Sequence, residues 1–276
     1  MPHAGFVNAH GLPVPWAAIA PTYRREDWTL PLPVLLAFAR EPRDRPGDVR
    51  ATELAGEIQQ AILKRRHDYY TDPVEGMWAM VGTGVHHALE AALGSMGKAS
   101  ESESEVRAEV GGLIVGGRID WVTDDELVDW KTMALYGAKL VYRNGVTKEK
   151  PDFIRQLTIY RALLALAGRP DPKRYTIAVL ARDHRSYEAK KERDYPPPFF
   201  AAEAEVPPVD EAVRILKAAV EEWKDAVLRP ASELPECKDL WKPRPDGLPT
   251  RCASYCQVNE FCSQFKRIKE GLRRNI

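Results

Sequence analysis

The sequence predicts an α/β fold, and two segments carry this prediction. Leu113–Val122 is apolar apart from Arg118 and Asp120, and a second strand-like run at residues 127–133 follows a polar turn at residues 123–126. We therefore expect a β-hairpin. A run rich in β-branched residues at 175–181 follows a helical pattern at 153–167. A strand reached through a helical crossover is expected to be parallel to its neighbour, so the sheet should be small and mixed, with helices beside it.

The remaining chain divides into segments of different character. Helical patterns cover residues 52–64, with Thr52 as N-cap, and residues 78–96 and 209–227. Eight of the 22 prolines lie in the first 50 residues, which predicts an irregular arm with a helical turn or two around residues 33–40. Residues 99–105 read as a polar linker, 106–110 as a strand and 188–198 as a loop. The expected organisation is an arm (1–50), a core (51–230) and a tail (231–276).

Composition excludes several classes of protein. The chain has 276 residues with 44% hydrophobic and 29% charged residues, as expected of a globular protein rather than a disordered one. No run approaches the ~18 apolar residues of a membrane span, and the N-terminus does not resemble a secretory signal. We expect a cytoplasmic protein that has no membrane partner. The 40 basic and 40 acidic residues balance, which counts mildly against a nucleic-acid binder, although charge can be concentrated locally.

The hairpin contains charged residues that need an explanation. Side chains alternate along a strand, so Asp129 and Lys131 project from the same face. Burying charge is costly unless it is paired or bound to metal. A divalent cation held by Asp120 and Asp129 would compensate for this cost, with Lys131 placed to meet developing negative charge. The alternative is a solvated hairpin with a surface ion pair of little energetic value.

This pattern resembles the D…DxK arrangement of the PD-(D/E)XK nucleases. Two flanking helices extend the resemblance to the RecB-type branch of that superfamily. The sequence G-T-x-V-H-x-x-L-E matches a helix whose histidine coordinates the metal, and by position this residue is His86, not His87. Gln156 and Tyr160, four residues apart and so on one helix face, match the Q-x-x-x-Y motif after D…DxK. The resemblance covers about residues 52–262 and implies a restriction-endonuclease-like core.

The cysteines indicate a second metal site. Cys237, Cys252, Cys256 and Cys262 have gaps of 14, 3 and 5 residues, and the first 236 residues contain no cysteine. In a cytoplasmic chain such clustering favours metal binding over disulfides. Structural zinc prefers C-x₂₋₄-C pairs, which only Cys252 and Cys256 form, whereas an iron–sulfur cluster takes four thiolates at irregular spacing. The resemblance also favours a [4Fe-4S] cluster, but in those nucleases one cysteine typically precedes the core, and here all four follow it.

The resemblance implies a Mg²⁺- or Mn²⁺-dependent DNA exonuclease, active in recombination, repair or phage DNA processing (in the host cytoplasm if the protein is phage-encoded). His86, Asp120, Asp129 and the carbonyl of Trp130 would hold the metal. Lys131 would stabilise developing charge, and Gln156 and Tyr160 would position the DNA strand and the active-site groups. The alternatives are an endonuclease of the same fold and a catalytically silent DNA-binding or recombination-partner module. DNA is the expected partner, single- or double-stranded, and the protein partners considered are a single-strand annealing protein or a helicase.

Overall fold

The computed structural model describes residues 3–38, 47–98 and 101–274. The chain forms two compact units. The first consists of Met1–Asp44, Gly56–Met80 and Glu222–Ile276, and the second of Arg45–Ala55 and Val81–Glu221. No helix among the described residues is both long and apolar enough to cross a membrane.

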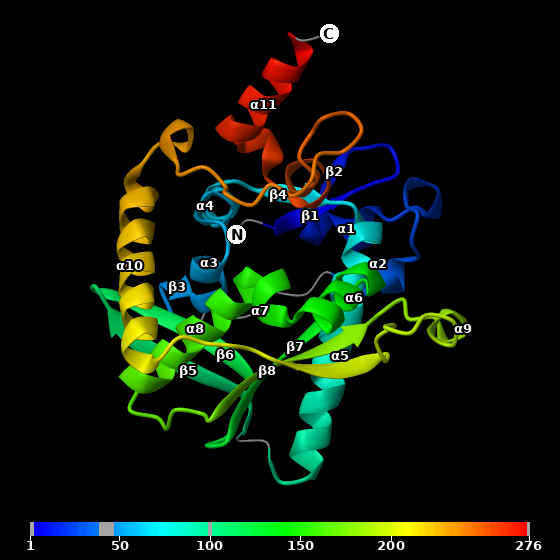
Figure 1. Ribbon diagram of the computed structural model, residues 1–276. Helices are drawn as coiled ribbons and strands as arrows, with labels where there is room; N and C mark the ends of the chain where they lie inside the picture. Colours follow the sequence, from blue (N-terminus) through cyan, green and yellow to red (C-terminus); the bar gives the residue numbers. More distant parts are fainter. Residues whose placement is uncertain (1–2, 39–46, 99–100, 275–276) are drawn as a thin grey trace. The chain divides into compact units, whose positions relative to one another are not determined.

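The second unit contains a six-stranded mixed sheet with helices beside it, so the predicted fold class is confirmed (Figure 1). β6 and β7 form the expected antiparallel hairpin, and β7 and β8 are parallel in register from Glu126↔Arg174 to Met133↔Ala181. The strands, in the order β3-β6-β7-β8-β9 with β5 also paired to β6, are β3 (Val49–Arg50), β5 (Ser102–Val110), β6 (Leu113–Val122), β7 (Glu126–Met133), β8 (Arg174–Ala181) and β9 (Phe199–Glu203).

Alternation along β7 divides the sheet into two faces. Val128 and Trp130 form a small core cluster with Ala178, against which Leu89 and Leu93 of helix α5 pack. Asp129 and Lys131 point to the opposite face, where they meet helix α8. The helices of this unit are α3 (Ala51–Ala55), α6 (Leu135–Asn144), α7 (Val146–Glu149), α8 (Pro151–Leu166) and α9 (Ser186–Ala189), and the unit boundaries fall within α5 (Pro73–Ser95) and α10 (Val209–Leu228).

One edge of β6 is only partly covered by other strands. β5 pairs along most of one edge, from Leu113 to Trp121. On the other edge β3 pairs with Val115 and Gly116, and β7 pairs with Trp121 and Val122. Among the described strands none pairs with residues 117–120 on that edge, because β6 and β7 diverge beyond the turn. Backbone polar groups in such a gap must find other partners, and the candidate site is built from those partners.

The first unit shows that the prediction of an irregular N-terminal arm is wrong. It contains a three-stranded sheet in the order β2-β1-β4, formed by β1 (His3–Val7), β2 (Pro13–Pro15) and β4 (Tyr69–Thr71). Phe6, Ile19, Trp28 and Leu35 close into their own core. The helical turn expected around residues 33–40 is α2 (Leu32–Phe38), and its last two expected residues lie outside the described part. The other helices are α1 (Trp16–Thr22), η1 (Arg25–Asp27), α4 (Ile58–Arg66), η3 (Ala231–Glu233), η4 (Arg251–Tyr255), η5 (Asn259–Phe261) and α11 (Ser263–Arg273).

Two other local predictions need correction. The single helix expected at residues 52–64 is two helices, α3 and α4, because the chain is extended at Glu57 (φ −80°, ψ 115°). The Glu57 carboxylate accepts hydrogen bonds from the backbone N–H groups of Lys238 and Asp239 at 3.2 and 3.1 Å. The break between the two helices places the Glu57 side chain within reach of these N–H groups. The polar linker expected at residues 99–105 ends earlier, since β5 begins at Ser102; residues 99–100 lie outside the described part.

Helix α8 packs so closely on β6 that position 117 has little room for a side chain. A Cβ atom at Gly117 would lie 2.6 Å from Cε1 of the Tyr160 ring, whereas a Cβ at Gly84 in α5 would meet nothing within 4 Å. We expect Gly117→Ala to lower the free energy of unfolding by about 1–3 kcal/mol through overpacking, and Gly84→Ala to raise it by about 0.5–1 kcal/mol through helix propensity. Denaturant unfolding of both variants measures this, and a Gly117→Ala protein as stable as wild type would contradict the packing described here.

Candidate active site

The backbone of Trp130, beside the gap in β6, is held by two of the predicted site residues. Its N–H donates to Oδ2 of Asp120 at 2.7 Å, in place of a ladder bond to β6. Its carbonyl oxygen lies 3.1 Å from Nε2 of His86 on α5. The structure therefore brings three of the four predicted metal-binding residues, His86, Asp120 and Trp130, into direct contact.

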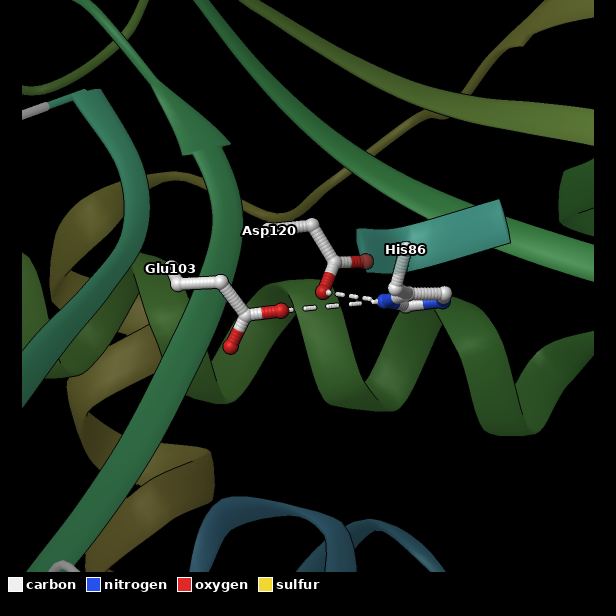
Figure 2. Close-up of side chains that lie close together, drawn as sticks. All are labelled: His86, Glu103 and Asp120. Atoms are coloured by element: carbon white, nitrogen blue, oxygen red, sulfur yellow. Dashed lines mark ion pairs between the residues drawn. The ribbon is translucent and has the colours of Figure 1, made fainter. Parts of the chain in front are cut away.

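A glutamate that the sequence analysis missed completes this cluster. Nδ1 of His86 lies 3.2 Å from Oδ1 of Asp120 and 3.8 Å from Oε1 of Glu103. Figure 2 shows the two carboxylates, one from β5 and one from β6, pointing at the same imidazole nitrogen. The three residues offer ligand atoms within 4.8 Å of one another. They form a candidate acidic metal site.

Glu103 reaches the site through strand register and an unusual backbone conformation. The pairs Ser102↔Trp121 and Ser104↔Ile119 flank it, so it lies opposite Asp120, and cross-strand neighbours of this kind are close enough to interact. Its φ of 48° lies in the left-handed region, which residues other than glycine rarely adopt and which is often found at functional sites. The only signal in the sequence is the alternation of Glu101, Glu103 and Glu105, which does not distinguish one glutamate from the next.

The electrostatics of the metal-free cluster centre on His86. Hydrogen bonds to Asp120 and then Glu103 raise the pKa of the His86 imidazole to about 10, against the opposing effect of burial. Both ring nitrogens face oxygen acceptors, Nδ1 the carboxylates and Nε2 the Trp130 carbonyl. This geometry suits an imidazolium, in which both nitrogens are donors. The protonated ring thus donates to the same oxygen atoms that could instead bind a divalent cation.

Asp129 and Lys131 form a second group beside this cluster, since the charges of Asp120 and His86 also act on the Asp129 carboxyl. Oδ2 of Asp129 forms an ion pair with the Lys131 ammonium. Nε2 of Gln156 donates to Oδ1 of Asp129 at 2.9 Å, while Oε1 of Gln156 accepts from Nζ of Lys131 at 3.3 Å. Burial raises the pKa of the Asp129 carboxyl, and the Lys131 charge opposes this effect. One amide therefore orients both charged residues of the D-x-K motif.

Tyr160 anchors this amide to the uncovered edge of β6. Its hydroxyl donates to the Arg118 carbonyl oxygen at 2.8 Å and accepts from Nε2 of Gln156 at 3.0 Å. Burial, with the nearby Asp129 charge, raises the pKa of the phenol, so the hydroxyl keeps its proton and remains a donor. The ring fits over the strand because residue 117 is a glycine. The helix face predicted to carry Gln156 and Tyr160 does meet the D-x-K residues.

The four cysteines lie together in the first unit. Cys237, Cys252, Cys256 and Cys262 line one pocket with Gln59, Gln60, Leu63, Asn259 and Phe265, and all four are free thiols. Burial is the largest influence on three of them. It raises the pKa of the Cys237 thiol to about 12 and that of Cys252 to about 11, and it also raises the pKa of Cys256.

The cluster around His86 generates a pH-dependent prediction for the metal-free protein. The folded-state pKa of His86, about 10, exceeds the ordinary value of 6.5. Its contribution to the free energy of unfolding is therefore fully present below pH 6.5 and lost as the pH rises through about 10. NMR titration of the ring should show a midpoint near pH 10, and His86→Asn should remove this part of the pH dependence of unfolding. A midpoint near 6.5 in the folded protein would contradict the ion-pair geometry.

Comparison with known proteins gives a family match. Residues 34–263 match the family model of the PD-(D/E)XK nuclease superfamily. Among solved structures, SSO0001 is 16% identical with a TM-score of 0.43, over 78% of this chain and 85% of that chain. LHK-Exo, an alkaline exonuclease from Laribacter hongkongensis, is 15% identical with a TM-score of 0.37, over 65% of this chain and 89% of that chain. Its complex with dAMP is 16% identical with a TM-score of 0.38, over the same shares. Among curated proteins, no sequence matches this one.

Proposed function

This chain belongs to the PD-(D/E)XK nuclease superfamily, and from that premise we propose that it is a metal-dependent deoxyribonuclease that hydrolyses phosphodiester bonds from DNA ends. The observation that carries the proposal is the network in which Gln156 joins Asp129, Lys131 and Tyr160. We place the chain in the RecB-type branch because His86 and the Gln156/Tyr160 pair both meet the D…DxK residues. Membership of the RecB-type branch favours an enzyme that acts at DNA ends over one that cuts internally.

The residues of the site fit a hard divalent cation. Carboxylate and carbonyl oxygens are the preferred ligands of Mg²⁺ and Mn²⁺, and Mn²⁺ also accepts imidazole. Asp129 is 3% exposed, and the Lys131 ammonium pairs with its Oδ2 atom, a carboxylate oxygen that can accept from more than one partner. Such a buried oxygen has ligand capacity left. We propose His86, Asp120, Asp129 and the Trp130 carbonyl as the metal-binding groups, with Glu103 added to them.

The proposed chemistry assigns a separate task to each protein group. When bound, the cation would act as a Lewis acid that offsets negative charge on the phosphate. Lys131 would donate to developing negative charge, and it is preorganised for this because Asp129 and Gln156 fix its ammonium group. Gln156 is a positioning residue in this scheme. Tyr160 positions Gln156 in turn through its bond to the Arg118 carbonyl.

We further propose that the cysteine tail holds a structural metal group, a [4Fe-4S] cluster in preference to zinc. Four thiols line a single pocket, which suits either group, and their irregular spacing favours iron–sulfur. Bound thiolates carry net negative charge. Lys64 and Arg251 are the cations that act electrostatically on Cys256 and Cys252 respectively, so the surroundings can offset that charge.

Digestion of DNA tests the catalytic proposal. Wild type should degrade linear DNA with Mg²⁺ or Mn²⁺ and not with EDTA, and should leave covalently closed DNA intact. Asp129→Asn and Lys131→Met should each lower the rate by about 10²–10³ or more, because they remove a charge arranged for the transition state. Lys217→Met is the matched control, since Lys217 is an exposed lysine on α10, and it should cleave like wild type.

Each alternative has a distinct outcome in this assay. Cleavage of closed DNA would show an endonuclease. Metal-dependent binding without any cleavage by wild type would indicate a binding module. Substantial cleavage by Asp129→Asn or Lys131→Met would refute the assigned roles, provided circular dichroism shows that both variants fold.

Removal of the tail metal should lower stability before it affects cleavage. The group would tie residues 237–262 into one unit, and its binding free energy would be part of the folding free energy. We expect Cys252→Ser, or wild type after chelation or oxidation, to melt at a lower temperature while residual folded protein still digests DNA. Calorimetry with iron, sulfide and zinc analysis of the same samples measures this. An unchanged melting temperature after complete metal loss would contradict a structural role.

A further inference from the structure

Two buried glutamines beside the cysteines differ in how their amides are held. Gln264 is fixed by the backbone of Cys237, because its Oε1 accepts from the N–H at 2.9 Å and its Nε2 donates to the carbonyl at 3.0 Å. Gln59 on α4 is 1% exposed, and its Oε1 lies 3.2 Å from Sγ of Cys262 and 3.5 Å from Sγ of Cys237. Its Nε2 is buried and has no hydrogen-bond partner among the described residues.

An unpartnered buried amide nitrogen is destabilising, and the protonation state of the cysteines explains why it is found here. A thiol donates its S–H to the amide oxygen, which is the arrangement here. A metal-bound thiolate has no proton and can only accept. The two ends of an amide have nearly the same shape, so Gln59 can turn over about its last torsion angle and present Nε2 to the same two sulfurs. The orientation in which Nε2 of Gln59 has no partner is therefore the one expected when the thiols are protonated and no metal is bound.

We infer that Gln59 is a hydrogen-bond donor to the sulfur ligands Cys237 and Cys262 of the metal group in the tail. The inference rests on the proposal that the four cysteines bind metal. Cys262 already receives one backbone donor, the N–H of Phe265 at 3.4 Å in the first turn of α11. Gln59 would add a side-chain donor shared between two sulfurs. Donors to cluster sulfur stabilise the reduced, more negative state and so raise the reduction potential.

The experiment compares Gln59→Met with Gln264→Met in the full chain reconstituted with iron and sulfide. Methionine keeps the length of the side chain and removes its donors. Redox titration followed by visible absorbance and EPR should show a lower midpoint potential for Gln59→Met, equivalent to about a tenfold smaller reduced-to-oxidised ratio, or ~59 mV for one electron. Gln264→Met should keep the wild-type potential while melting earlier, because its amide touches backbone and not sulfur.

Other outcomes are also decisive. If wild type takes zinc instead of iron, the readout becomes zinc release to a chelator, expected to be about 10- to 100-fold faster in Gln59→Met. If Gln59→Met does not fold, Gln59→Glu replaces it as the test variant. An ionised glutamate keeps the shape of the glutamine side chain but has no N–H donors, so it should shift the potential or the release rate in the same direction. A potential or release rate equal to wild type would overturn the role of Gln59. Wild type that binds neither iron nor zinc on its cysteines would overturn the metal proposal itself, and this inference with it.

Discussion

The site of this protein depends on an interruption in strand pairing. Along one edge of β6 no described strand pairs with residues 117–120, since β7 diverges after two residue pairs. Side chains satisfy the backbone groups that the gap exposes: the Tyr160 hydroxyl binds the Arg118 carbonyl, and Asp120 binds the Trp130 N–H. Buried backbone groups demand such partners. The residues proposed for chemistry are thereby fixed in place by structural hydrogen bonds, and Gly117 leaves room for the ring that makes one of them.

This arrangement also balances charge without metal. Asp120 and Asp129 are both buried, and unpaired buried carboxylates would be strongly destabilising. Each has a cation from within the second unit, His86 for Asp120 and Lys131 for Asp129. A bound divalent cation would take over the role of the His86 proton. The fold of this unit can therefore form before metal binds, with its ligand residues already close together.

Features that depend on contacts between residues close in the sequence could be predicted, and features that depend on contacts between distant residues could not. The hairpin around residues 123–126 and the Gln156/Tyr160 face depend on turn chemistry and helix period, and both were predicted. Glu103 depends on the register of β5 against β6, which local sequence does not reveal, and its segment was expected to be a linker. The N-terminal sheet joins His3 to Tyr69, a pairing between distant residues. The spacing of the cysteines predicts a metal site, and this stays a prediction. The position of Gln59 beside them could not be predicted, because it lies 178 residues from Cys237.

The two units differ in what holds their functional residues together. In the second unit, carboxylates, cations and amides satisfy one another in the metal-free state. In the first unit, four thiols line a pocket, and burial raises the pKa values of Cys237, Cys252 and Cys256. The Gln59 amide nitrogen beside them has no hydrogen-bond partner among the described residues. Glu57, at the break between α3 and α4, is one of the groups that hold the tail, through the N–H groups of Lys238 and Asp239. The tail thus has more to gain from a bound metal than the catalytic site does, since metal would satisfy groups that the protein alone leaves unsatisfied.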